Sequence, residues 1–226
     1  MKRQFAIDES VPNEYAVRQV SLNEMPPPPP PSPPQNGVAC ESSIIPIKFH
    51  LGGNRYLTVS IFKGQKYVHF REYEFSDNAC FPTKKGIALP ARRFASLLQK
   101  CNEINETVQQ VENGISTQYK VHIGGGVFVT VNGEYQRVDV RAFFVPPGQA
   151  EEKATCRGMA FKLCEWKKFI EVIPRLLEMD TEIASTLPCY LEAHHPIIVE
   201  QTGCCECAPF DANVIRLENE LFSAFV

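Results

Sequence analysis

The chain contains an internal repeat in which similar short segments recur 72 residues apart. His-Leu-Gly-Gly at residues 50–53 recurs as His-Ile-Gly-Gly at residues 122–125. Lys-Gly-Ile-Ala-Leu at residues 85–89 recurs as Arg-Gly-Met-Ala-Phe at residues 157–161. A fixed period of this kind indicates that one structural unit occurs twice in tandem.

A third pair of segments indicates where the two copies differ in length. Val-His-Phe-Arg at residues 68–71 recurs as Val-Asp-Val-Arg at residues 138–141, an offset of 70, and Phe94 then matches Trp166, again at 72. The offsets predict a two-residue deletion in one hairpin and a two-residue insertion in a later loop. Because loops tolerate such changes, the pattern favours duplication of one module.

The first copy has the pattern of strands. Residues 56–62 and 67–75 are rich in β-branched and aromatic residues, and Lys-Gly-Gln at residues 63–65 is expected to form the turn between them. Side chains alternate between the two faces of a strand, so Val68 and Phe70 share one face, which we expect to be buried. The other face then carries Tyr67, His69, Arg71 and Tyr73.

A helix is predicted to follow the strands of each copy. After a short strand at residues 86–89, Pro90 suits the first turn of a helix, and Asn-Gly at residues 113–114 ends it. The second copy offers strands at residues 127–131 and 136–145 and a helix through Trp166, Phe169, Ile170 and Ile173. We expect Pro174 to kink or stop this second helix.

Basic residues are concentrated in the first copy, although the whole chain has a formal net charge of −3. Residues 44–100 contain ten lysines and arginines and three acids, whereas residues 179–226 contain one arginine and eight acids. A basic block in a slightly acidic protein indicates a defined site for a polyanion. Because the sequence offers no phosphate-binding loop before a helix and no nucleophile elbow, we do not expect an enzyme.

Four blocks of the first copy occur in a characteristic order. They are Gly-Gly-Asn-Arg-Tyr at residues 52–56, Phe-Lys-Gly at 62–64, Val-His-Phe-Arg-Glu-Tyr at 68–73 and Pro-Thr-Lys-Lys-Gly-Ile-Ala-Leu at 82–89. In this order and near this spacing they resemble the DNA-binding domain of the positive-cofactor-four transcriptional coactivators. The resemblance covers about residues 47–101, and over residues 119–178 it rests mainly on the internal repeat.

The resemblance implies an α+β fold built from two tandem modules. Each is expected to be a curved four-stranded antiparallel sheet followed by one α-helix, and the two are expected to pack as an intramolecular pseudo-dimer. The expected domains are a disordered proline-rich arm at residues 1–43, a first module at 44–113, a divergent second module at 117–180 and a Cys-rich acidic tail at 181–226.

Known members of the family bind single-stranded or melted DNA in the groove between paired sheets. They act as general coactivators of RNA polymerase II or in genome maintenance, which implies a nuclear location and no cofactor. Whether this chain completes its own pair or forms a homodimer stays open.

The candidate nucleic-acid-binding residues combine cations, flat rings and a glycine. Binding of a single strand without sequence preference needs cations along the backbone and aromatic rings on which bases stack, worth about 1–3 kcal/mol per base. Lys84 and Lys85 stand beside Gly86, which lets the backbone approach a phosphate. The candidate set is Arg55, Phe62, Lys63, Lys66, Arg71, Tyr73, Lys84, Lys85, Gly86, Arg141 and Arg157.

Both copies depart from the family pattern. Asn-Gly-Glu at residues 132–134 replaces the Phe-Lys-Gly tip in the second copy, which keeps Arg141 and Arg-Gly at residues 157–158. We therefore expect this copy to bind DNA weakly and mainly to complete the pair. In the first copy Phe94 stands where tryptophan is usual. His69 stands where an acid is frequent and adds positive charge only when it is protonated.

The tail is rich in potential metal ligands, namely Cys189, His194, His195, Cys204, Cys205 and Cys207. They are enough for a zinc site. We interpret Cys-Cys-Glu-Cys at residues 204–207 as lacking the usual two-residue gap, and therefore expect ordinary thiols and no metal. Residues 211–225 are predicted to form a short acidic helix that packs on the repeats, contacts a partner or covers the basic groove.

Two alternative functions stay open. One is a protein-interaction scaffold with decayed DNA binding, in which the proline run at residues 26–34 or the acidic tail recruits partners such as the transcription machinery. The other is a viral or mobile-element protein that binds single-stranded DNA. Salt-dependent binding of an oligonucleotide separates the first alternative from the main prediction.

Overall fold

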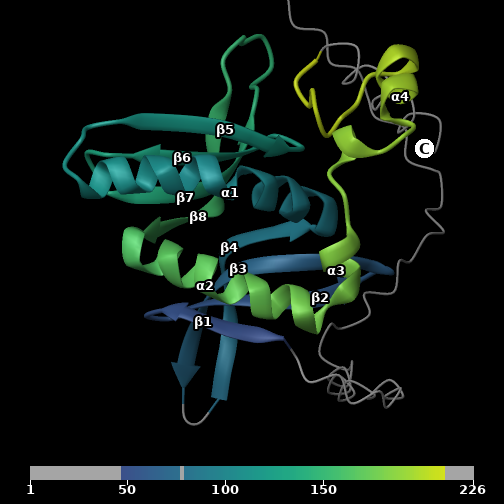
Figure 1. Cartoon of the computed structure of the whole chain (residues 1–226). Coiled ribbons are helices and arrows are strands. Elements are labelled where there is room, and N and C mark those ends of the chain that lie inside the picture. Colours follow the sequence, from purple (N-terminus) through teal and green to yellow (C-terminus); the bar gives the residue numbers. More distant parts are fainter. Residues whose placement is uncertain (1–46, 77–78, 212–226) are drawn as a thin grey trace, which may run out of the picture. The chain divides into compact units, whose positions relative to one another are not determined.

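The computed structural model describes residues 47–76 and 79–211 (Figure 1). The predicted proline-rich arm lies outside this part of the chain, and so does all but the first residue of the predicted acidic helix. Among the described helices, none combines the length and the apolar composition that crossing a membrane requires.

The described strands form an eight-stranded sheet in which neighbouring strands are antiparallel. The order β1-β2-β3-β4-β8-β7-β6-β5 brings β4 and β8 together in the middle, where Gly86 pairs with Gly158. The predicted α+β class with an antiparallel sheet is confirmed. The strands are β1 (Lys48–Gly52), β2 (Arg55–Phe62), β3 (Gln65–Ser76), β4 (Ala79–Pro90), β5 (Gln118–Gly124), β6 (Val127–Asn132), β7 (Arg137–Phe144) and β8 (Lys153–Lys162).

A long helix follows each set of four strands. Helix α1 (Ala91–Glu112) follows β4, with Pro90 at its start and Asn113 at its end, as predicted. Helix α2 (Leu163–Met179) follows β8 and does not stop at Pro174. Burial of Leu176 beyond the proline offsets the hydrogen bond that a proline removes from a helix. We call β1–β4 with α1 the N-terminal half, and β5–β8 with α2 the C-terminal half.

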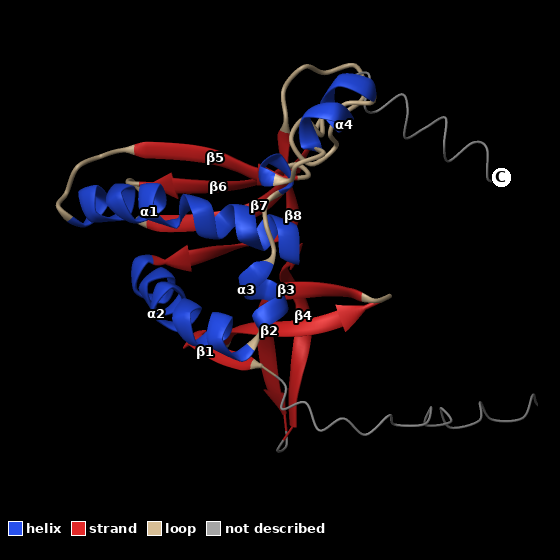
Figure 2. Ribbon diagram, turned by 45° about the vertical axis from the view of Figure 1, so that its right-hand side comes forward, coloured by secondary structure: helices blue, strands red, loops and turns tan. Residues whose placement is uncertain are grey.

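The two long helices lie on the same face of the sheet, and no long helix of the described residues lies on the other face (Figures 1 and 2). Strand residues that point toward the helices, such as Val68 and Phe70, are fully buried. The ring of Phe70 lies 5.1 Å from that of Phe169 on α2, so residues of both halves share one apolar core. Alternation of buried and half-exposed residues along the strands follows from this one-sided coverage.

Each long helix also contacts strands of the other half. Helix α1 packs on β5, and α2 packs on β1. The indole Nε1 of Trp166 on α2 donates a hydrogen bond to Asn105 Oδ1 on α1 at 2.8 Å. The halves are therefore joined by their helices as well as by the central pair of strands.

The same irregularity recurs in both halves, where β3 meets β4 and where β7 meets β8. The register shifts after Arg71 in the first case and after Arg141 in the second. At each shift a threonine hydroxyl donates to a backbone carbonyl: Thr83 to Glu72 O at 2.9 Å, and Thr155 to Ala142 O at 2.8 Å. These β-bulges bend the strands and redirect the two arginines.

The described part of the tail contains α3 (Thr181–Ser185), a 3₁₀ turn η1 (Cys189–Leu191) and α4 (His195–Gln201). Two ion pairs attach it to α1, Arg92 to Glu192 at 2.9 Å and Arg93 to Glu206 at 2.7 Å. The amide of Gly125, in the turn between β5 and β6, donates to the carbonyl of Glu206 at 2.9 Å. The segment around Glu206 therefore lies against the C-terminal half.

Candidate nucleic-acid interface

The face of the sheet opposite the long helices carries the polar and aromatic side chains that the strand pattern predicted. On β3, Tyr67, His69, Arg71 and Tyr73 are half-exposed, whereas Val68 and Phe70 between them are buried. The predicted assignment of these residues to two faces is thus observed. We call this surface of the N-terminal half the open face.

Arg71 lies at a cavity of about 230 Å³ on the open face. Its Nη1 donates to the carbonyl of Thr83 at 3.1 Å, but its buried Nε has no hydrogen-bond partner among the described residues. A buried donor without a partner costs about 1–3 kcal/mol, and more when the group is charged. The cavity is lined by Thr58, Ser60, His69, Arg71, Tyr73 and Pro82. This arrangement suits an anionic ligand that accepts hydrogen bonds from the guanidinium.

Arg141 occupies the corresponding place in the C-terminal half and is used differently. Its Nη1 donates to the carbonyl of Thr155 at 2.8 Å, as Arg71 does to Thr83. Its Nε and Nη2, however, bind both carboxylate oxygens of Asp139, at 2.8 and 3.2 Å. The residue that aligns with Asp139 is His69. Within residues 47–76 and 79–211, a carboxylate therefore neutralises Arg141 and none neutralises Arg71.

His69 adds little positive charge to the open face at neutral pH. Burial, and secondly the charge of Arg71, lower the pKa of its imidazole below the ordinary value of 6.5. Its Nε2 lies 2.7 Å from Ser60 Oγ. From the sequence, His69 is expected to add positive charge only when its imidazole is protonated. In the unbound protein near pH 7 the imidazole is therefore not protonated.

An aromatic cluster lies next to Arg71. The rings of Tyr56 and Tyr73 meet edge to face at 5.1 Å, and Lys48 Nζ lies 4.3 and 3.9 Å from their centroids. His50 stacks obliquely on Tyr56 at 5.0 Å, and the exposed Phe75 lies 6.4 Å from it. Flat rings beside cations are the side chains on which bases of a single strand stack.

The C-terminal half has a matching cluster with the same spacings. Phe128 and Phe143 meet at 5.1 Å, His122 lies 4.9 Å from Phe128, and Lys120 Nζ lies 4.5 and 4.4 Å from the two phenyl rings. Phe210 of the tail stacks almost parallel on Phe128, with an interplanar angle of 11° and a centroid distance of 6.5 Å. The tail thus contacts this cluster, and no such contact is found at Tyr56 among the described residues.

The β2–β3 hairpin presents Phe62 and Lys63 at its tip. Lys63 (φ 50°) and Gly64 (φ 76°) form a two-residue turn of the type that closes tight hairpins. The ring of Phe62 is 61% exposed, and Lys63 Nζ lies 5.6 Å from its centroid. Arg71 is six residues further along β3 than Gln65, the residue paired with Phe62, which corresponds to about 20 Å.

The predicted cations on β4 and β8 are exposed. Lys85 pairs with Glu72 at 3.3 Å but remains 72% exposed. Within residues 47–76 and 79–211, Lys63, Lys84 and Arg157 form no ion pair. These side chains can meet a phosphate without breaking a buried interaction.

Three predicted site residues have structural contacts instead. Arg55 reaches across to the C-terminal half and binds Glu165 Oε2 at 2.6 Å. Lys66 binds Asp180 at 2.7 Å and Glu182 at 2.9 Å. Gly86 adopts φ 139°, and a side chain there would overlap the carbonyl oxygen of Phe70. The charges of Arg55 and Lys66 are thus paired within the protein, and Gly86 lets β3 and β4 approach each other next to Arg71.

Some residues around the cavity escaped prediction. Tyr56, Thr58 and Ser60 of β2 lie opposite Arg71, His69 and Tyr67 of β3. Tyr56, Thr58 and Ser60 are two residues apart on the predicted strand at residues 56–62. This spacing puts them on one face, and it could have identified them from the sequence. Lys48 was missed because β1 was not predicted, and its ring contacts depend on how β1 pairs with β2.

Comparisons with known proteins agree with the sequence resemblance over the N-terminal half. The family model described as Transcriptional Coactivator p15 (PC4) matches residues 49–100, so this segment carries a domain of the PC4 coactivator family. A Caenorhabditis elegans protein named "Putative RNA polymerase II transcriptional coactivator" is 40% identical over 60 residues. These are 26% of this chain and 48% of that protein, so the match spans about half of the relative's length. No solved structure matches the chain.

Proposed function

We propose that this protein binds single-stranded or melted DNA on its open face and catalyses no reaction. The observation that carries the proposal is Arg71, which lies beside a cavity and an aromatic cluster and whose buried Nε has no hydrogen-bond partner in the described part of the chain. A phosphodiester oxygen would accept the hydrogen bonds that the guanidinium leaves unmade. Tyr73, Tyr56 and the exposed Phe62 would stack bases, and Lys63, Lys84 and Lys85 would contact neighbouring phosphates.

We further propose that the halves are copies of one module, paired within the chain as a pseudo-dimer. The matching bulges, threonine hydrogen bonds and aromatic clusters support this relation. The contacts of each long helix with the other half support pairing within one chain. On this proposal the protein is a monomer of 25.4 kDa in solution, which light scattering after gel filtration measures directly.

In this pair the N-terminal half is the binding half. The C-terminal half keeps Arg157 exposed, but Arg141 is neutralised by Asp139, and Phe210 lies on its aromatic cluster. Its β6–β7 turn carries Gly133 and Glu134 in place of the Phe-Lys tip. Its main contribution is therefore to complete the sheet and the core.

The cellular role we propose is that of a transcriptional coactivator in the nucleus. The family match at residues 49–100 and the name of the relative support it. Partners in the transcription machinery would be reached through the proline-rich arm or the acidic tail. A protein-interaction scaffold without DNA binding is the second candidate, supported by the pairing of Arg141 with Asp139 in the C-terminal half.

The proposal is tested by fluorescence anisotropy with a labelled single strand of about 20 nucleotides and the matching duplex, at several salt concentrations. We expect preference for the single strand and binding that weakens with salt. Arg71→Ala should lower the affinity tenfold or more, since hydrogen bonds to charged groups contribute about 1.5–3 kcal/mol. Lys63→Ala and the double change Lys84→Ala with Lys85→Ala should each reduce the salt dependence.

Lys168→Ala is the matched control, because Lys168 is an exposed lysine on α2, on the helix side of the sheet. It should leave binding unchanged. Absent binding by the wild-type chain at low salt, or equal binding of single strand and duplex, would overturn the proposal and favour the scaffold.

A further inference from the structure

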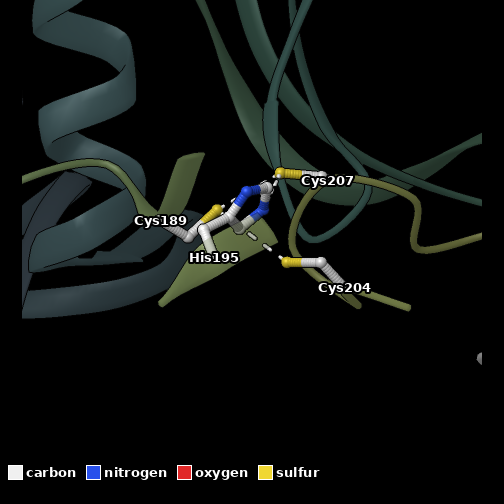
Figure 3. Close-up of side chains that lie close together, drawn as sticks. All are labelled: Cys189, His195, Cys204 and Cys207. Atoms are coloured by element: carbon white, nitrogen blue, oxygen red, sulfur yellow. Dashed lines mark hydrogen bonds between the residues drawn. The ribbon is translucent and has the colours of Figure 1, made fainter. Parts of the chain in front are cut away.

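Four potential metal ligands of the tail converge at one point (Figure 3). They are Cys189 of η1, His195 at the start of α4, and Cys204 and Cys207 of the following loop. Their ligand atoms all lie within 4.8 Å of one another. Cys189 Sγ lies 3.3 Å from Cys207 Sγ and 4.0 Å from Cys204 Sγ, and His195 Nε2 lies 3.2 Å from Cys207 Sγ.

These separations fit a tetrahedral zinc site. With Zn–S bonds of about 2.3 Å and a Zn–N bond of about 2.0 Å, tetrahedral angles put neighbouring ligand atoms about 3.5–3.8 Å apart. The three separations given above, 3.2–4.0 Å, bracket this range, and all the ligand atoms lie within 4.8 Å of one another. Three thiolates and one imidazole are also a complete ligand set for a closed structural site, and soft sulfur ligands favour zinc over hard cations.

The spacing along the chain also agrees with a metal site once the correct residues are paired. Two residues, Cys205 and Glu206, separate Cys204 from Cys207, which is the gap that zinc loops commonly use. The sequence interpretation took Cys205 as a ligand and so missed this gap. Cys189 and His195 come from a separate segment, and only the folded tail brings them to the loop.

A disulfide or simple contact of thiols explains the cluster less well. A disulfide joins two sulfurs at about 2.0 Å and leaves the third cysteine and the histidine without a role. All four of these side chains point to the same centre in Figure 3. His194, next to His195 in the chain, is exposed and not part of the cluster.

We propose that Cys189, His195, Cys204 and Cys207 bind one Zn²⁺ ion that holds the tail on the C-terminal half. Glu206, between two of the ligands, then keeps its bidentate contact with Arg93 and its carbonyl contact with the Gly125 amide. Phe210, three residues beyond Cys207, is held on Phe128. The zinc site thereby keeps Phe210 on the aromatic cluster of Phe128 and Phe143, the counterpart of the Tyr56 and Tyr73 cluster. This proposal does not depend on DNA binding.

The metal content of the full chain, purified with reductant and without added chelator, is the direct test. Elemental analysis should find one zinc and no iron per chain. After removal of zinc, added Co²⁺ should give the strong visible bands of tetrahedral cobalt and a thiolate-to-cobalt charge-transfer band. Absence of zinc from the reduced chain together with failure to bind added Zn²⁺ or Co²⁺ would overturn the proposal.

Paired variants locate the site. His195→Ala and Cys207→Ser should lose the bound zinc, whereas His194→Ala and Cys205→Ser should keep one equivalent. Cys207→His keeps a zinc ligand at the position and should retain metal, even if Cys207→Ser folds poorly. Equal zinc in His195→Ala and wild type would contradict this ligand set, and so would a Cys189–Cys207 disulfide that persists in the presence of reductant.

Hydrogen exchange of the wild-type chain tests whether the metal holds the segment around Glu206 against the C-terminal half. Removing zinc should speed exchange of the Gly125 amide, because the acceptor carbonyl of Glu206 is then no longer fixed. The amide of Leu57, deep in the N-terminal half, should exchange at the same slow rate with and without metal. Unchanged exchange at Gly125 would show that the metal does not hold the tail.

Discussion

Arg71 and Arg141 lie at corresponding bulges, but among the described residues a carboxylate pairs with Arg141 and none pairs with Arg71. The difference comes from the residue two positions earlier on the same face of the strand, His69 in one case and Asp139 in the other. An aspartate at this distance binds the guanidinium in a bidentate pair, which uses the donors that a phosphate would need. A single residue therefore sets the charge available at each bulge.

His69→Asp should accordingly weaken binding of single-stranded DNA by roughly tenfold, because the new carboxylate would pair with Arg71 and also repel phosphate. Anisotropy at fixed salt measures the effect. His69→Asn, similar in size but uncharged, is the control and should change the affinity by less than about threefold. If both variants bind like wild type, Arg71 is not the phosphate contact.

The lowered pKa of His69 predicts a dependence of stability on pH. In the unfolded chain the imidazole has its ordinary pKa near 6.5, whereas burial and Arg71 depress it in the folded protein. Below about pH 6.5 the unfolded state therefore binds more protons, so the free energy of unfolding falls as the pH falls. Urea unfolding should show a smaller loss between about pH 7.5 and 5.5 for His69→Asn than for wild type. An equal loss would mean that His69 is not responsible.

At the level of elements, β4 has two roles. The sequence predicts for its residues Lys84, Lys85 and Gly86 a single role, contact with a phosphate. Lys84 and Lys85 lie exposed at the bend of β4, whereas Gly86 is buried between Phe70 of β3 and the partner strand β8. The glycine was expected to let the backbone approach a phosphate. In the fold it lets β3 and β4 approach each other, because a Cβ at this position would overlap the carbonyl of Phe70.

Gly86→Ala should therefore lower the free energy of unfolding by about 3 kcal/mol, combining backbone strain with steric overlap. Gly64→Ala is the control within the same half, since φ there is also positive but nothing lies within 4 Å of the added methyl. It should cost only about 1–2 kcal/mol. Urea titrations of the two variants give both numbers, and equal losses would contradict the assigned role of Gly86.

For the whole molecule, the ion pair between Arg55 and Glu165 joins the two halves. The stability lost when it is removed measures how strongly the halves depend on each other. The pair joins β2 to the start of α2 at 2.6 Å, with the two side chains 23% and 10% exposed. Glu165 also accepts a hydrogen bond from the Lys162 amide at 2.8 Å and so caps α2. Loss of either partner leaves a charge that is largely removed from water.

Glu165→Ala should destabilise the protein by about 2 kcal/mol, below the range for fully buried pairs because Arg55 is partly exposed. Lys167→Ala removes the exposed pair with Glu112, which also joins α2 to α1, and should cost less than about 1 kcal/mol. Unfolding should be a single transition in both variants because the halves share one core. Two separate transitions would show that the halves fold independently.

Much of the fold could be predicted because local patterns carry it. Alternation along β3 identified its two faces, and Pro90 and Asn113 marked the ends of α1. Strand β1 was missed because five residues with one buried side chain give almost no periodic signal. Pro174 marks a place where packing against the core outweighs a local preference.

The sequence by itself determined the α+β composition, the antiparallel character implied by the family resemblance, and the basic and aromatic residues of β2 to β4. These follow from side-chain alternation, turn chemistry and short motifs, which act between near neighbours. The tertiary structure decided which of these cations form ion pairs: Arg55, Lys66 and Arg141 do, whereas Arg71 forms none with the described residues. It also brought Cys189 and His195 to Cys204 and Cys207. Such long-range pairings depend on how the helices and the tail cross the sheet, and no local pattern encodes that.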